Sequence, residues 1–221
     1  MEAHLRSDVP YCLFYSGGID STLIMYFMNI LNLNKKICAY NVNFLSNGIN
    51  QDQSIKNIAN QFNIEFNQIN FTEEDFWNLL PFAAKNIDEP IADYAILPTF
   101  KMAREASKNF KVALSGEGGD ELFAGYGRYK SLRKPYKGAF RKLKFLEQKN
   151  WDFNIKMSMN SDAEFSELQR FKHFDYLNWL PNNLLVKLDR CLMAYGMEGR
   201  TPLIDKELFN KFFYLEDKFK Q

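Results

Sequence analysis

The segment Tyr15–Thr22, "YSGGIDST", separates a short apolar run from a longer one that can form a helix. Glycines at such a point let the backbone turn tightly, and the N-terminus of a following helix carries partial positive charge. With the hydroxyl groups of Ser16, Ser21 and Thr22 nearby, this turn can hold a phosphate group. Its spacing matches neither the Walker loop nor the dinucleotide fingerprint.

Asp20 lies inside this turn, where an anion site would normally exclude a carboxylate. A carboxylate next to phosphate makes sense if a magnesium ion lies between them. The alternative is an ordinary Gly-Gly turn between a strand and a helix, with Asp20 close to the start of the helix.

A second glycine-rich turn occurs in Leu114–Tyr126, "LSGEGGDELFAGY", again directly after an apolar run. It contains three carboxylates, Glu117, Asp120 and Glu121, among its glycines. Carboxylates this close in sequence repel one another unless a positive group joins them. The segment therefore predicts a second turn that contributes to a ligand site.

Hydrophobic periodicity predicts the elements that position the two turns. Strands are expected in "YCLFY", "KKICAYNVNF", "IEFNQINF" and "FKVALS", with helices over 21–31, 51–61, 72–86 and 99–108, the third capped by Thr72 and the last opened by Pro98. Such alternation favours an α/β fold with a doubly wound parallel sheet. From Phe165 on, every segment is expected to be helical, and the predicted division is an ATP-binding α/β portion over 1–127 and a helical portion over 128–221.

A strand order of 3-2-1-4 would make the first and fourth strands neighbours beside the point where the order reverses. Ligands of such sheets bind at the carboxyl ends of the strands at that point. Both turns would then lie at one end of the sheet, and Asp20 and Asp120 could share a magnesium ion. The expected ligand is a nucleoside triphosphate with its metal.

Composition excludes several other classes of protein. The formal net charge is +1, so no global field attracts nucleic acid or a membrane surface, and no apolar run approaches the roughly 20 residues of a membrane span. Cys12 and Cys38 lie in apolar runs, which predicts buried thiols, not a disulfide framework, and favours the cytoplasm. The basic run 128–149 is expected to be a solvated face.

Three segments, in order along the chain, resemble a known family. "SGGIDS" is similar to the pyrophosphate (PP) loop of the N-type ATP pyrophosphatases, and "LSGEGGDELFAGY" resembles the second signature of the asparagine synthetase family. "DRCLMAYGMEGRTPLID", residues 189–205, resembles that family's third signature. The resemblance implies an adenine nucleotide alpha hydrolase-like fold and the C-terminal synthetase domain of this family.

The resemblance also implies an activity. In this family, ATP with Mg²⁺ adenylates the side-chain carboxylate of aspartate, pyrophosphate leaves, and ammonia displaces AMP to give asparagine. The expected enzyme is therefore a C–N bond-forming ligase of asparagine biosynthesis. The alternatives are a related adenylating amidotransferase or cyclase that acts on another carboxylate, and a truncated ATP-binding module without catalysis.

Site residues follow from the resemblance position by position. It implies that magnesium is bound by Asp20 and Asp120 and that Glu117 supports adenylate formation and accepts a proton from ammonia. The implied nucleotide-binding residues are Tyr15, Ser16, Gly17, Gly18, Asp20, Ser21, Val42, Ser115 and Gly116. Tyr15 and Val42 have an alternative role as plain sheet core. The charged residues Asp189, Arg190, Glu198 and Arg200 are expected to form internal ion pairs that join the helical half to the sheet.

Two departures from the family pattern concern the ends of the sequence. The phosphate turn begins at residue 16, which leaves no room before it for the family's glutamine-hydrolysing domain. Ammonia is therefore expected to be free or to come from a separate glutaminase domain or subunit. At the other end, Lys218 and Lys220 do not lie in the family's late lysine motif, so the sequence is expected to be truncated and its activity alone is in question.

Overall fold

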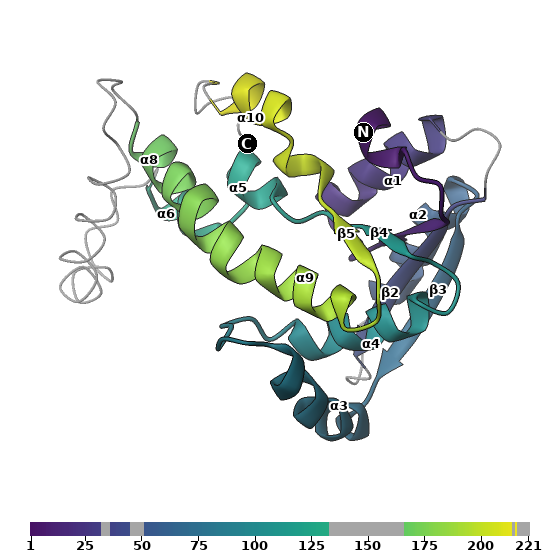
Figure 1. Cartoon of the computed structure of the whole chain (residues 1–221). Helices are drawn as coiled ribbons and strands as arrows, with labels where there is room; N and C mark the ends of the chain where they lie inside the picture. Colours follow the sequence, from purple (N-terminus) through teal and green to yellow (C-terminus); the bar gives the residue numbers. More distant parts are fainter. Residues whose placement is uncertain (32–35, 45–50, 133–165, 214, 216–221) are drawn as a thin grey trace. The chain divides into compact units, whose positions relative to one another are not determined.

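The described strands form one five-stranded parallel sheet (Figure 1). The structure, a computed structural model, describes residues 1–31, 36–44, 51–132, 166–213 and 215. The strand order is β3-β2-β1-β4-β5, and every neighbouring pair is parallel. The strands are β1 (Tyr11–Phe14), β2 (Cys38–Phe44), β3 (Glu65–Phe71), β4 (Val112–Leu114) and β5 (Glu198–Arg200). The predicted order of the first four strands is confirmed.

Helices connect the strands and follow them in the chain. They are η1 (Glu2–Leu5), α1 (Ile19–Leu31), α2 (Gln51–Gln61), α3 (Glu73–Asn86), α4 (Ile96–Ala106), α5 (Gly119–Phe123), α6 (Gly127–Leu132), α8 (Glu167–Phe174), the π-helix η2 (Asp175–Leu185), α9 (Val186–Met193), η3 (Pro202–Ile204) and α10 (Lys206–Phe212). None of the described helices is long and apolar enough to cross a membrane.

The chain forms two compact units, each of which combines two separate stretches of the sequence. The first contains residues 1–117 and 183–202, and therefore the whole sheet with α9. The second contains residues 118–182 and 203–221. The predicted division after residue 127, into two portions of one synthetase domain, stays a prediction.

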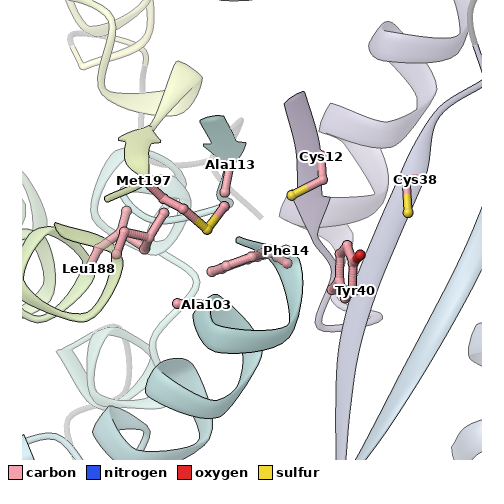
Figure 2. Packing of buried hydrophobic residues seen from close by; sticks show 10 residues of the cluster. Cys12, Phe14, Cys38, Tyr40, Ala103, Ala113, Leu188 and Met197 are labelled. Atoms are coloured by element: carbon pink, nitrogen blue, oxygen red, sulfur yellow. The ribbon is translucent and has the colours of Figure 1, made fainter. Parts of the chain in front are cut away.

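The core of the first unit lies between the sheet and the pair α4 and α9. Because side chains alternate across a strand, Cys12 and Phe14 share one face of β1. They pack with Ala103 of α4 and Leu188 of α9. Figure 2 shows Leu188 and Met197 next to Ala113 of β4, with Phe14 on the neighbouring strand. Helices α1 and α2 cover the other face, so the sheet is doubly wound as predicted (Figure 1).

All three cysteines are buried and free, as expected for thiols in apolar surroundings. Burial raises the pKa of the Cys12 thiol far above its ordinary value, and the thiolate of Cys38 would raise it further. These thiols are core residues, and they form no disulfide framework.

Two expectations about secondary structure were wrong. Residues 198–200 form β5, although everything after Phe165 was expected to be helical. This strand has only three residues and pairs with β4, so its extended shape depends on a distant partner that local periodicity cannot reveal. Pro98 does not open its helix, because α4 already begins at Ile96. The basic run 128–149 lies mostly outside the described residues.

Helix α3 begins at a capping box, as the sequence predicted for Thr72. The Thr72 hydroxyl accepts a hydrogen bond from Asp75 N at 3.2 Å, and Asp75 Oδ2 accepts one from Thr72 N at 2.9 Å. Lys101 of α4 forms an ion pair with the same carboxylate. Burial raises the pKa of Asp75, but the hydrogen bonds from Lys101 and Thr72 outweigh it and lower the pKa to about 2.

We expect Thr72→Ala to lower the free energy of unfolding by about 1 kcal/mol at pH 7, because α3 loses its cap. Urea denaturation measures this change, and Thr72→Ser, which keeps the hydroxyl, is the matched control. Since the folded pKa of Asp75 is depressed, its contribution is present above the unfolded pKa of about 3.9 and is lost as the pH falls toward 2. An equal loss in Thr72→Ser and Thr72→Ala would contradict the capping role.

Candidate functional site

The first glycine turn connects β1 to α1 and is held by its own hydroxyl groups. Ser21 Oγ donates to Gly18 O at 3.1 Å, and Gly18 N donates to Ser16 Oγ at 3.3 Å. The two serine hydroxyls lie 3.1 Å apart. Because α1 begins at Ile19, the backbone N–H groups of its first turn have no partners within the helix. The turn thus places two serine hydroxyl groups beside a helix N-terminus, where a phosphate group can bind.

Gly17 has a positive φ of 81°, which L-residues with a side chain rarely adopt. A Cβ at this position would also lie 2.6 Å from Cγ1 of Ile55 in α2. The glycine is therefore required both by the conformation of the turn and by the close approach of α2.

The second turn lies against the first. Ser115 follows β4, is buried, and donates its backbone N–H to Arg200 O of β5 at 2.9 Å. A Cβ on Gly116 would lie 3.1 Å from Ser21 N and 3.3 Å from Asp20 Cβ. The two turns are thus neighbours at the carboxyl ends of β1 and β4, as the predicted strand order required.

Tyr15 and Val42 lie where the sequence placed them, at the ends of the first two strands. The Tyr15 ring is buried, edge-on to Phe66 of β3 at a centroid distance of 6.3 Å. Its hydroxyl accepts a hydrogen bond from Thr22 Oγ1 at 3.4 Å. Val42 packs, partly buried, against a core cluster between β3, α3 and α4. These contacts fit the core role that was left open, and a contact with nucleotide stays a prediction.

Glu117 is paired with a residue that the sequence analysis missed. Lys187 of α9 is buried, and its Nζ donates to Glu117 Oε1 at 2.9 Å and to Asp93 Oδ2 at 2.7 Å. Burial lowers the pKa of Lys187, but Glu117 and Asp93 outweigh it, so the pKa is raised. The only signal in the sequence was the position of Lys187 two residues before the third resembling segment.

The remaining acids of the second turn belong to the second unit. Glu121 is buried, and its Oε1 accepts a hydrogen bond from the Tyr126 hydroxyl at 2.6 Å. Burial raises the pKa of Asp120, although Arg128 opposes this shift. The three carboxylates therefore have different surroundings, and the positive group that joins Glu117 is Lys187.

Magnesium binding by Asp20 and Asp120 stays a prediction, because the two residues belong to different units. Within the described part of the chain, no group of three or more histidine, cysteine, aspartate or glutamate residues is placed to hold a metal ion. Magnesium usually takes only one or two carboxylates together with substrate phosphates, so this observation leaves the predicted pair untouched.

The charged residues near β5 form ion pairs, but their partners are largely exposed, so the expectation of internal pairs was wrong. Arg200 Nε lies 2.7 Å from Glu198 Oε1, and its guanidinium also donates to His4 O and Arg6 O. Arg190 pairs with Asp88 at 2.6 Å. Arg200 therefore holds the N-terminal segment beside β5.

A parallel α/β sheet with two adjoining glycine turns at its strand ends has the architecture of a nucleotide-binding domain. The chain matches the asparagine synthase family over residues 1–221 and belongs to that family.

Similar curated proteins are glutamine-hydrolysing asparagine synthetases by name. The chain is 27% identical to asparagine synthetase 1 of Bacillus subtilis over all of its own length and 43% of that protein. It is 28% identical to a putative asparagine synthetase of Mycobacterium tuberculosis, covering 93% of the chain and 39% of the relative. A putative asparagine synthetase of Methanocaldococcus jannaschii is 31% identical over 80% of the chain and 34% of that protein.

The chain thus spans about two fifths of the length of the relatives it matches. Among solved structures, the U34-tRNA thiolase NcsA from Methanococcus maripaludis is similar with a TM-score of 0.42 and 14% identity, covering 96% of this chain and 75% of that one.

We expect Gly116→Ala to lower the free energy of unfolding by about 1–3 kcal/mol, because the added methyl would press on the first turn of α1. The matched control is Gly127→Ala, where an added Cβ meets nothing within 4 Å, and its change should stay within about 0.5 kcal/mol. Urea denaturation compares the two variants. Equal stabilities would mean that the two turns do not touch as described.

Proposed function

We propose that this chain is the ATP-dependent, amide-forming ligase domain of an asparagine synthetase. The single observation that carries the proposal is the contact between the two glycine turns, where Gly116 lies against the first turn of α1. This contact brings a phosphate-type turn next to the segment that contains Glu117. Membership of the asparagine synthase family supports the choice of reaction.

The first turn would bind the pyrophosphate portion of ATP. Its donors are the Ser16 and Ser21 hydroxyls and the backbone amides from Gly17 and Gly18 into α1. These groups would stabilise the charge that develops on pyrophosphate as it leaves. Ser115 and Gly116, with Tyr15 and Val42, are proposed to approach the nucleoside.

Magnesium would be held by Asp20 and Asp120, with phosphate oxygens completing its coordination. When bound, it would neutralise charge on the leaving pyrophosphate. Asp20 is suited to this task because it lies in the first turn of α1, beside the proposed phosphate donors.

The proposed reaction has two steps. An oxygen of the aspartate side-chain carboxylate attacks the α-phosphorus of ATP, and the bond to pyrophosphate breaks. Ammonia then attacks the carbonyl carbon of the aspartyl-adenylate, AMP leaves with the bridging oxygen, and the proton released by the nitrogen passes to Glu117. Asparagine, AMP and pyrophosphate are the products.

Ammonia is proposed to be free or to come from glutamine through a separate domain or subunit. The names of the relatives specify glutamine hydrolysis, and this chain matches about two fifths of their length. A cytoplasmic location, without nucleic-acid or membrane partners, is part of the same proposal.

The test is aspartate-dependent exchange of labelled pyrophosphate into ATP in the presence of magnesium. It is run on the 221-residue chain and on the full product of its natural reading frame. We expect exchange in at least one form, and loss of about 10²-fold or more in Asp20→Asn, since the metal-binding carboxylate is removed. Asp88→Asn is the matched control, because Asp88 is exposed and lies in the loop after α3.

Three outcomes would overturn the proposal. Exchange that depends on another carboxylate would assign a different acceptor. Calorimetry could instead detect magnesium-dependent ATP binding while no pyrophosphate is released at high concentrations of aspartate and ammonia. That result would show that the chain is an ATP-binding module without catalysis. Equal rates of exchange in Asp20→Asn and wild type would show that the first turn takes no part in the reaction.

A further inference from the structure

Lys187 is a buried cation shared by two carboxylates from distant parts of the first unit. Its side chain is 6% exposed, while those of Asp93 and Glu117 are 11% and 22% exposed. Asp93 precedes α4, Glu117 follows β4 and Lys187 lies on α9, elements that can be followed in Figure 1. A buried charge is costly unless it is paired, so the arrangement depends on all three groups.

The two carboxylates are not equivalent. Asp93 uses both oxygens within the fold, because Oδ1 accepts the backbone N–H of Ala95 at 2.8 Å and Oδ2 accepts Lys187. Glu117 is bound through Oε1 only, and its Oε2 accepts no hydrogen bond from the residues that the structure describes. Lys187 therefore anchors one oxygen of Glu117, a side chain that is 22% exposed, and leaves the other oxygen available.

Lys187 is itself held rigidly. The next residue, Leu188, packs in the core between α9 and the sheet, and Cys191, one turn further, donates its thiol to Ile96 O of α4 at 3.6 Å. Burial raises the pKa of the Cys191 thiol to about 12, so it stays neutral beside the lysine. The charged groups that face Lys187 are thus Asp93 and Glu117.

We propose that Lys187 is a positioning residue for the proposed ligase reaction, which fixes Glu117 through Oε1 so that Oε2 can accept the proton released when ammonia attacks the adenylate. This inference rests on the proposed function. It also assigns Asp93 a role, which is to tie Lys187 to the start of α4. A shift of about 1 Å in such a group can cost about 10²-fold in rate.

The first experiment is a double-mutant cycle on amide formation, measured as AMP and asparagine release from aspartate, ATP and ammonia by the full reading-frame product. We expect Lys187→Met and Glu117→Gln each to lower kcat by about 10²-fold with little change in KM for ATP. The double variant should be no slower than either single one, since residues that act as a unit are not additive. Lys187→Arg should recover part of the rate.

The matched control is Lys101→Met. Lys101 also pairs with a carboxylate, Asp75, in the same unit, but it touches neither glycine turn. We expect it to keep the wild-type kcat while losing stability. Additive losses in the cycle, or a kcat in Lys101→Met as low as in Lys187→Met, would assign Lys187 a structural role only.

A second measurement does not depend on activity or on Lys187→Met folding. NMR titration of lysine ¹³Cε in the wild type should give a pKa for Lys187 above that of ordinary lysines, and Glu117→Gln should lower it. No change in Glu117→Gln would refute the pairing and with it the inference. A normal pairing without any aspartate-dependent exchange or amide formation would instead refute the proposed function.

Discussion

The close approach of Gly116 to the first turn of α1 is the constraint on which the site depends. It requires β1 and β4 to be neighbours, both turns to follow the carboxyl ends of their strands, and residue 116 to lack a Cβ. Ser115 N, bonded to Arg200 O, fixes the second turn from its other side. The first glycine turn and the acidic second turn therefore lie at the same end of the sheet. The distance between them is set by contacts of the backbone, not by contacts of side chains.

Charge in the first unit is arranged by pairing. Lys187 pairs with two carboxylates and is itself buried, whereas Arg190 and Arg200 pair with acids that are largely exposed. Exposed pairs contribute little to stability, so Arg200 matters more for the two N-terminal carbonyls that it binds. Removal of the buried Lys187 would leave the carboxylates of Asp93 and Glu117 without their cation. Its two ion pairs connect α9 to the start of α4 and to the end of β4.

Sequence reasoning predicted the elements with strong periodicity and the turns with distinctive chemistry. The order of four strands, the cap at Thr72 and the adjoining glycine turns all follow from local pattern and from the rules for parallel sheets. It missed β5, which depends on pairing with β4, and Lys187, whose partners are 70 and 94 residues away. It also treated three carboxylates as one cluster, although Glu117 pairs with Lys187 and Glu121 Oε1 accepts a hydrogen bond from Tyr126.

The third resembling segment now has a physical role of its own. Gly199 lies in β5 opposite Ala113, and a Cβ there would be 3.2 Å from Leu188 Cδ2. The absence of a Cβ at Gly199 therefore gives Leu188 room against the strand, with Lys187 next to it in the chain. Since β5 also supplies the Arg200 carbonyl that holds Ser115, the second turn is supported by two elements, β5 and α9. The backbone of β5 fixes the base of that turn, and α9 fixes the carboxylate of Glu117.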